Sequence, residues 1–369
     1  MKILITGAKG FIGKNLVYNL KSRGYNEIFE FARNNTIDEL ERYINECDFI
    51  YHLAGVNRPE NEEEYFKGNV QFTKMLLNFA KNTGRKIPIL FSSSIHAEKG
   101  NEYGKSKKMA EDLVFQYSEE TGASVYVFRL PNVFGKWSRP NYNSAIATFC
   151  YNITQDLPIQ VNDPEVELSL VYVDDVVNEF INALNGNVKR NGIYCEVPIV
   201  YKKKLKEIVN LLYSFKNSEE RIMVPNLSDD FIKKLYSTYL SFLPAERYYY
   251  LLKKHEDNRG FFAEFLKSEY SGQVSINVVK PGFTKGNHWH NTKVEKFLVV
   301  KGEGLIRLRK IDSDEIITYK VSDKELKVIN IPPGFTHNIQ NIGNEDMIVI
   351  IWANEIFDSD NPDTYYLEV

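Results

Sequence analysis

Along the N-terminal part of the chain, short runs of consecutive apolar residues alternate with longer segments whose apolar positions recur every three or four residues. Short apolar runs bounded by turn residues predict buried strands, and the longer periodic segments predict helices. The predicted strands are Ile3–Thr6, Ile28–Ala32, Phe49–Leu53, Ile89–Ser92 and Val125–Leu130. The predicted helices begin near Phe11, Thr36, Glu62 and Gly104. This alternation predicts a parallel, doubly wound α/β sheet.

The pattern changes twice further along the chain. From about residue 132 the alternation loosens into longer loops with scattered helices, such as one over Lys204–Phe215. After residue 252, short strands separated by Gly, Pro and Asn turns replace the helical periodicity, which is typical of an all-β barrel or sandwich. We therefore expect an α/β domain over 1–243 with a subdomain from about 132, a linker over 244–251 and a β domain over 252–369.

Composition excludes several classes of protein. With 43% hydrophobic residues the chain is able to bury real cores, so it is not disordered. The net charge of −3 offers no basic field for nucleic acid, and no apolar run approaches the roughly 20 residues that cross a membrane. Three scattered cysteines without C-x-x-C spacing indicate neither a disulfide framework nor a thiolate zinc site. We expect a cytoplasmic protein without nucleic-acid or membrane partners.

A glycine-rich turn follows the first predicted strand and opens the first predicted helix. Glycines at such a turn let the backbone approach a pyrophosphate, whose charge the helix N-terminus favours. The turn therefore predicts a dinucleotide-binding, Rossmann-type domain, although a plain strand–turn–helix junction also uses glycine. The residues expected to contact the cofactor here are Thr6, Gly7, Gly10, Phe11, Ile12 and Gly13.

Arg33 stands at the tip of the second predicted strand, in the stretch Phe31–Asn34, which carries no acid. Folds that prefer NAD usually place a carboxylate there to hold the ribose hydroxyls. A guanidinium pairs well with phosphate, so Arg33 favours NADP, with its 2′-phosphate, over NAD. The alternative is that Arg33 is a solvated surface residue.

Tyr103 and Lys107 lie four residues apart and therefore share one face of a helix. A lysine cation lowers the pKa of a nearby phenol, which then passes a proton to a carbonyl oxygen. This spacing is common by chance, but it gains weight from Ser92–Ser94, where a predicted strand ends in hydroxyls just upstream.

The motifs of this half, in this order, resemble the extended short-chain dehydrogenases, a family that acts mainly on nucleotide sugars. The resemblance covers most of residues 1–243 and rests on Thr6–Gly13, His52–Gly55, Asn69, Ser92–Ser94, Tyr103 with Lys107, Arg129–Gly135 and Val173–Asp175. It implies that Tyr103 is the acid, that Lys107 holds the nicotinamide ribose, and that Ser94, with Ser93 as the alternative, orients the substrate carbonyl. It further implies cofactor contacts from Leu53, Ala54, Gly55 and Arg129 and a substrate contact from Asn132. The interval between the serines and Tyr103 is shorter than in many members, which implies a trimmed loop over the sugar.

A set of histidines and a carboxylate marks the β half. His288 and His290 share one face of a strand because side chains alternate with period two. With Glu295 and His337 they make a plausible ligand set for a divalent first-row metal, and the spacing resembles the two cupin motifs, except that Leu326 replaces the leading glycine of the second. The alternative is a barrel whose histidines act without metal.

A second resemblance concerns the segment Asp257–Glu264, which looks like the entry motif of the dTDP-4-dehydrorhamnose 3,5-epimerase cupins. It implies substrate contacts from Arg259 and Glu264, His288 as the base and Lys296 as the lysine that stabilises an enolate. His290 replaces a glutamine of those metal-free enzymes, which favours metal in this chain. Ile350–Trp352 replaces the region of their acid tyrosine, so inversion at one carbon is easier to support than inversion at two.

The whole chain, a reductase domain followed by a cupin barrel (a jelly roll), resembles the family of bifunctional enzymes of capsular polysaccharide synthesis. That resemblance implies a UDP-linked 4-keto-6-deoxy-N-acetylhexosamine as substrate, epimerisation at carbon 3 in the cupin and NADPH-dependent reduction at carbon 4. The product would be UDP-N-acetyl-6-deoxy-L-talosamine, and the family further implies zinc and a homodimer. Other hypotheses stay open: a single-function reductase with a structural or dimerising cupin, a sensor without turnover, and a cupin oxygenase.

Overall fold

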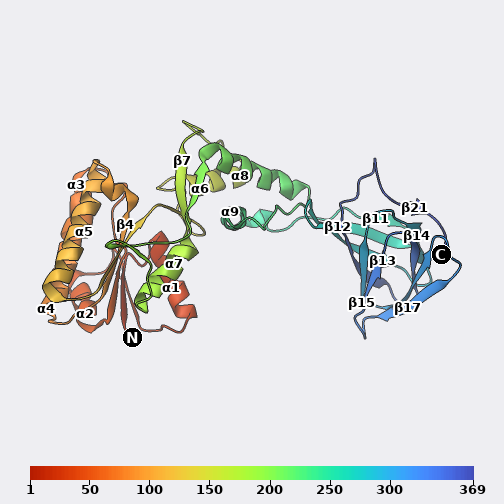
Figure 1. Ribbon diagram of the computed structural model, residues 1–369, viewed down its shortest axis with the longest axis horizontal. Helices are drawn as coiled ribbons and strands as arrows, with labels where there is room; N and C mark the ends of the chain where they lie inside the picture. The colour runs from red at the N-terminus through yellow and green to blue at the C-terminus, as the bar shows by residue number, and fades with distance from the viewer. The chain divides into compact units, whose positions relative to one another are not determined.

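The computed structural model describes residues 1–369, which divide into two units (Figure 1). The N-terminal unit comprises 1–212 and 234–243, and the C-terminal unit comprises 213–233 and 244–369. The sequence places 213–233 in the N-terminal domain and a linker over 244–251, whereas both segments belong to the C-terminal unit. Residues 213–233 join that unit because Met223 forms a parallel bridge with Lys267, and the Val224 amide donates to the Lys267 carbonyl at 2.7 Å.

The N-terminal unit is built on a seven-stranded sheet with the order β2-β1-β3-β4-β5-β9-β8. Its strands are β1 (Ile3–Thr6), β2 (Ile28–Phe31), β3 (Phe49–His52), β4 (Ile89–Ser94), β5 (Val125–Leu130), β8 (Arg190–Asn191) and β9 (Tyr194–Cys195). All neighbours pair in parallel except β8 with β9. The predicted parallel, Rossmann-type sheet is therefore confirmed.

Helices cover both faces of this sheet, as Figure 1 shows, with α1 and α7 on one face and α2, α4 and α5 on the other. The helices are α1 (Phe11–Ser22), α2 (Ile37–Glu46), α3 (Glu63–Tyr65), α4 (Phe72–Asn82), α5 (Glu102–Thr121), α6 (Ala145–Thr154), α7 (Val173–Leu184), α8 (Leu205–Glu220) and α9 (Asp230–Leu240), with the π-helical turn η1 (Phe66–Gln71) and the 3₁₀ turns η2 (Ile95–Glu98) and η3 (Ala245–Arg247). A small sheet of β6 (Asn132–Phe134), β7 (Glu167–Tyr172) and β10 (Tyr201–Lys204) lies in the predicted subdomain. No helix combines the length and apolar character needed to span a membrane.

The order of the strands in the sheet reverses direction at β1. The chain moves from β1 outward to β2 and then crosses to β3 on the other side of β1. In open α/β sheets a ligand binds at the carboxyl ends of the strands where the order reverses in this way. The residues at that point are Thr6 at the end of β1 and His52 at the end of β3.

The C-terminal unit contains two antiparallel sheets that enclose one apolar core, as expected for a cupin barrel. One sheet has the order β11 (His255–Asp257), β12 (Gly260–Ser268), β13 (Gly272–Val279), β20 (Met347–Ala353), β15 (Glu295–Lys301) and β18 (Val328–Ile331). The other has the order β17 (Ile316–Ser322), β16 (Glu303–Lys310), β19 (Phe335–Asn341), β14 (Thr284–Trp289) and β21 (Tyr365–Tyr366). The all-β prediction is confirmed.

A bulge in β14 determines which of its side chains face inward. The pairing of β14 with β19 shifts between Gly286 and His288, and Asn287 takes a φ of 61° there. His288 therefore stands opposite His337, which is fully buried. Because paired residues of an antiparallel sheet point to the same side, His288 faces the interior of the barrel.

Candidate active sites

The glycine-rich turn forms as predicted at the carboxyl end of β1. Gly7 has a φ of +72°, and a Cβ there would lie 2.8 Å from the Ala54 nitrogen. A Cβ on Gly13 would lie 2.2 Å from the Gly7 carbonyl oxygen, so only glycine allows α1 to pack this closely. No side chain caps α1 after Gly10, which leaves the amides of its first turn, including Phe11 and Ile12, for an anionic ligand.

Thr6 lies beneath this turn rather than at its surface. Its hydroxyl lies 2.8 Å from Nδ1 of His52 and accepts from the Ala54 amide at 3.3 Å. The other ring nitrogen of His52 lies 2.8 Å from the Thr73 hydroxyl. Burial lowers the pKa of His52 to about 3, so the ring is neutral. This network holds Leu53, Ala54 and Gly55 against the glycine turn, so Thr6 supports the cofactor site through its neighbours.

Arg33 is exposed two residues beyond the end of β2, beside the glycine turn, whose Gly7 amide donates to the Phe31 carbonyl at 2.9 Å. Lys9, which the sequence reasoning passed over, reaches the same corner, because its Nζ donates to Asn34 at 3.2 Å. Its position between two glycines of the turn was the available signal. Two cations at this corner suit a phosphate on the adenosine ribose.

Tyr103 and Lys107 lie on the first turns of α5. The Asn101 side chain caps this helix by accepting from the Gly104 amide at 2.7 Å. Lys107 is buried, and its Nζ donates to the Ser92 carbonyl at 2.7 Å. Burial lowers the pKa of Lys107 to about 8, while a weaker influence of Glu111 raises it.

The structure separates the two candidate serines. The Ser93 hydroxyl is buried and donates to the Glu111 carboxylate at 2.5 Å. Ser94 instead contacts the Tyr103 phenol, and its hydroxyl accepts from the His96 amide at 3.1 Å. Burial raises the pKa of Tyr103, and the contact with Ser94 partly offsets the increase. The geometry therefore favours Ser94 over Ser93 as the partner of Tyr103.

Arg129 binds other side chains of the N-terminal unit. Its guanidinium binds both carboxylate oxygens of the buried Glu111, at 3.0 and 2.7 Å, and also donates to Glu98 and to the Tyr194 hydroxyl. The side chain therefore compensates a buried carboxylate, and its contact with the cofactor stays a prediction. Asn132 is exposed on β6, where its amide donates to the Ser169 carbonyl at 3.1 Å.

Asn69 lies on the π-helical turn η1, a type of turn that is frequent at functional sites. Its side chain accepts from the Val56 amide at 2.7 Å and donates to the Val56 carbonyl and to Ser106, each at 2.9 Å. A Cβ on Gly55 would lie 3.1 Å from the Asn69 oxygen and 3.7 Å from Nζ of Lys107. Asn69 therefore links the loop after β3 to the helix of the Tyr–Lys pair. The sequence placed Asn69 in the order of family motifs but did not indicate its role, because its contacts depend on the fold.

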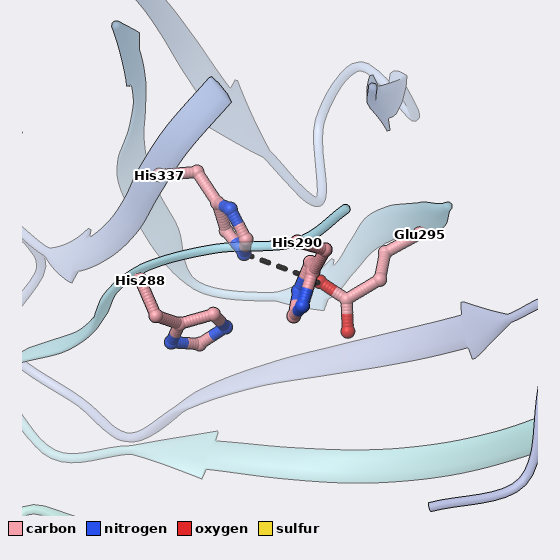
Figure 2. Close-up of side chains that lie close together, drawn as sticks. All are labelled: His288, His290, Glu295 and His337. Atoms are coloured by element: carbon pink, nitrogen blue, oxygen red, sulfur yellow. Dashed lines mark hydrogen bonds and ion pairs between the residues drawn. The ribbon is translucent and has the colours of Figure 1, made fainter. Parts of the chain in front are cut away.

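The four predicted metal ligands come together inside the barrel (Figure 2). Oε2 of Glu295 lies 3.3 Å from Nε2 of His290 and 3.1 Å from Nε2 of His337. The ring centroids of His288 and His337 are 4.5 Å apart. One ligand atom from each of the four residues fits within a span of 4.8 Å.

The hydrogen bonds of this cluster leave lone pairs that face one another. Nδ1 of His290 lies 2.6 Å from the Asp363 carbonyl, and Nδ1 of His337 lies 3.4 Å from the Phe335 carbonyl. A carbonyl only accepts, so each Nδ1 carries hydrogen, and in the neutral form of each ring Nε2 presents a lone pair toward the Glu295 carboxylate. Nε2 of His337 is buried without a hydrogen-bond partner. Converging acceptors of this kind repel unless a cation lies between them.

The distances fit a divalent cation. An ion bound tetrahedrally at about 2.1 Å holds its ligand atoms roughly 3.4 Å apart, close to the separations of 3.1 and 3.3 Å at Glu295. Burial, with the neighbouring His337, lowers the pKa of His288 to about 4. The set therefore offers one carboxylate and three imidazoles, which are ligands of first-row metals.

Lys296 does not join this cluster, which corrects its expected role beside the base. Glu295 faces inward, so the next residue on β15 points outward, because side chains alternate along a strand. Lys296 is exposed, and its Nζ donates to Asn330 at 2.5 Å. Of the expected substrate contacts, Arg259 pairs with Asp257 at 2.7 Å, and Glu264 pairs with Lys267 at 2.6 Å.

Comparison with known families matches residues 3–194 to the NAD dependent epimerase/dehydratase family and residues 255–365 to the polysaccharide biosynthesis C-terminal domain. The chain belongs to the NAD dependent epimerase/dehydratase family. It is 46% identical over 369 residues, 100% of this chain and 99% of the relative, to UDP-2-acetamido-2,6-beta-L-arabino-hexul-4-ose reductase from Pseudomonas aeruginosa.

Solved structures match the whole chain as well. The capsular polysaccharide assembling protein CapF from Staphylococcus aureus shares 52% identity over 100% of both chains, with a TM-score of 0.95. CapF with the inhibitor 3-isopropenyl-tropolone shares 49% identity over 100% of both chains, with a TM-score of 0.89. The predicted resemblance to two-domain capsular enzymes is thereby confirmed, and family membership makes the N-terminal unit a nicotinamide-dependent oxidoreductase domain.

Proposed function

We propose that the protein is a bifunctional nucleotide-sugar enzyme of capsule precursor synthesis. Its C-terminal cupin epimerises a UDP-linked 4-keto-6-deoxy-N-acetylhexosamine at carbon 3, and its N-terminal domain reduces carbon 4 with NADPH. The observation that carries this proposal is the presence of two separate reactive sets in one chain: Tyr103, Lys107 and Ser94 in one unit, and His288, His290, Glu295 and His337 in the other. The relatives support it, since one is named as a hexul-4-ose reductase and the other as a capsular polysaccharide protein.

The reduction needs a proton at the carbonyl oxygen and a hydride at carbon 4. NADPH supplies the hydride when bound, and Tyr103 donates the proton from a phenol that burial keeps protonated. Ser94, which contacts Tyr103, orients the same oxygen. Lys107 holds the nicotinamide ribose and tunes Tyr103, while exposed Arg33 supports NADPH over NADH through the 2′-phosphate.

The epimerisation removes a proton beside the ketone from one face of the sugar, and a proton from solvent water adds to the opposite face. A divalent cation held by His290, Glu295 and His337, which we propose is zinc, supplies Lewis-acid stabilisation of the enolate oxygen when bound. His288 takes the proton, because burial keeps its imidazole neutral and it faces the same point. The tropolone inhibitor of CapF supports a metal, since a ketone and a hydroxyl on adjacent carbons chelate divalent cations.

The chemistry sets the order of the two steps. A proton on carbon 3 is acidic only while carbon 4 is a ketone, so epimerisation precedes reduction. The product is then UDP-N-acetyl-6-deoxy-L-talosamine. We place the protein in the cytoplasm, which its three unpaired, buried cysteines support. We further propose that it is a homodimer, which the exposed apolar run Tyr248–Leu251 supports.

The test is an assay with purified enzyme, zinc and the 4-keto UDP-sugar. We expect absorbance at 340 nm to fall as NADPH is consumed, and proton NMR of the product to show the talo configuration. Absence of NADPH consumption would contradict the reductase, and a product with unchanged configuration at carbon 3 would leave a single-function reductase with a structural cupin.

A further inference from the structure

The C-terminal segment of the chain runs alongside the strand that carries the histidines. In β21, Tyr366 pairs with His288 and Tyr365 pairs with Trp289. The Leu367 amide donates to the Asn287 carbonyl at 3.0 Å, in the bulge that turns His288 inward. A segment remote in sequence from the ligand strand therefore lies directly beside it.

Asp363, two residues before β21, closes the loop between His290 and Glu295. Its Oδ1 accepts from the Asn291 amide at 2.9 Å. Its Oδ2 accepts from the amides of Thr292 and Lys293, at 2.9 and 3.0 Å, and from the Thr292 hydroxyl at 3.1 Å. One carboxylate thus satisfies three consecutive amides that no strand or helix would pair.

The backbone carbonyl of Asp363 contacts His290, one of the proposed metal ligands, directly. The Asp363 carbonyl lies 2.6 Å from Nδ1 of His290, which requires hydrogen on Nδ1 and leaves Nε2 as the ring nitrogen that can bind a cation. Partners of this kind orient metal-bound imidazoles and fix their tautomer. Asp363 therefore controls both the position of the loop and the state of the ring.

The backbone of Asp363 is held in a strained conformation by contacts of its neighbours. Its φ of 37° lies in the left-handed region, which a non-glycine residue keeps only when the surroundings impose it. The buried Lys293 donates from Nζ to the Pro362 carbonyl at 2.7 Å, and the Thr336 hydroxyl, next to His337, donates to the Leu367 carbonyl. The segment is therefore anchored on both sides of Asp363.

We propose that Asp363 is a positioning residue for the cation site, acting through His290 and through the loop that spaces His290 from Glu295. This inference rests on the proposed metal site of the cupin. It adds to the site a residue that does not bind the metal itself. This residue lies 73 positions from His290 in sequence and belongs to no metal-ligand motif.

The test measures zinc affinity by competition with a chromophoric chelator, using the full-length protein. We expect Asp363→Ala to weaken zinc binding about 10- to 100-fold, and Asp363→Asn, which keeps one acceptor oxygen, to weaken it less. The control Asp360→Ala removes an exposed carboxylate of the same segment and should bind zinc like wild type. Cobalt substitution gives a second readout, because a displaced His290 changes the visible absorption of the bound ion.

The outcomes separate the possible failures. Wild-type affinity in Asp363→Ala, with only a lower Tm of the zinc-free protein, would overturn the positioning role and leave a structural one. Wild-type protein that binds no zinc would overturn the proposed metal site as well. If Asp363→Ala does not fold, Asp363→Asn decides between the two, and unchanged NADPH binding verifies that the N-terminal unit is intact.

Discussion

In the N-terminal unit the buried polar groups around Tyr103 find hydrogen-bond partners within the protein, whereas in the barrel the buried ligand atoms face one another. Lys107 donates to the Ser92 carbonyl, and Asn69 satisfies both polar groups of Val56. By contrast, Nε2 of His337 is buried beside the Glu295 carboxylate without a hydrogen-bond partner.

This difference indicates what each site needs from outside. A site whose polar groups are already paired is preorganised to pass one proton, and it needs only the cofactor and the ketone. A site of converging lone pairs gains stability when a cation enters it, so its order depends on the ion. The two units should therefore respond differently to substitution, to metal removal and to pH.

The largest expected effect concerns Tyr103→Phe, which deletes the proton donor. NADPH oxidation should fall about 10²- to 10⁴-fold, while deuterium exchange at carbon 3 continues, because the cupin set lies in the other unit. Tyr65→Phe is the control, since its ring lies beside Tyr103 at 5.7 Å and its hydroxyl makes only a long contact with Asn57. Loss of both activities in Tyr103→Phe would indicate one shared site.

Substitution of single histidines should distinguish the metal ligands of the cupin from its base. We expect His337→Gln to lose bound zinc and carbon 3 exchange together, and His288→Gln to keep zinc while exchange falls by about 10²-fold or more. Metal content by mass spectrometry and exchange by NMR distinguish the two. His255→Gln, an exposed histidine of the same unit, serves as the control. Zinc loss in His288→Gln would make that residue a ligand rather than the base.

Arg33→Ala should affect the choice of cofactor rather than the chemical step. Loss of a charged hydrogen bond to the 2′-phosphate is expected to raise KM for NADPH about 10- to 100-fold, with KM for NADH unchanged. The exposed Arg42 on α2 provides the matched control, Arg42→Ala. Equal effects on both cofactors would contradict the phosphate contact.

The pH profile of reduction should reflect Lys107. Its pKa is lowered to about 8 by burial, so the side chain is a cation below that pH and neutral above it. Because the cation holds the ribose and tunes Tyr103, kcat/KM should be level below pH 8 and fall by up to about tenfold per pH unit above it. Lys107→Met should abolish this limb along with most activity, whereas a rate that rises above pH 8 would contradict the assignment.

The smallest effect is expected for Lys296→Ala. The side chain points out of the barrel to Asn330, so carbon 3 exchange should change less than about twofold, as for a surface substitution. A loss of exchange comparable to that of His288→Gln would restore Lys296 to the active site.

The sequence predicts most of the fold because its signals are local. The five predicted parallel strands all form within two residues of their predicted ends, and α1 begins at Phe11 as expected. The position of residues 213–233 was missed because it depends on pairing with Lys267, far along the chain.

The candidate sites show the same limit. The ion pair of Arg129 with the buried Glu111 was not predicted, because Glu111 lies on a helix, 18 residues away in sequence. Lys296 was assigned by resemblance although strand alternation from Glu295 points it outward. The histidine pair was predicted from a regular strand, but a bulge at Asn287 turns His288 inward, and His290 lies beyond the end of β14.

The central claim is that the cupin carries out its own reaction. Its most direct test is proton NMR of the 4-keto-6-deoxy UDP-sugar in deuterated water, with zinc-loaded enzyme and without NADPH. We predict deuterium at carbon 3, lost when a chelator removes the zinc and regained when zinc is restored. No exchange at either carbon beside the ketone would contradict the account and reduce the barrel to a structural module attached to a reductase.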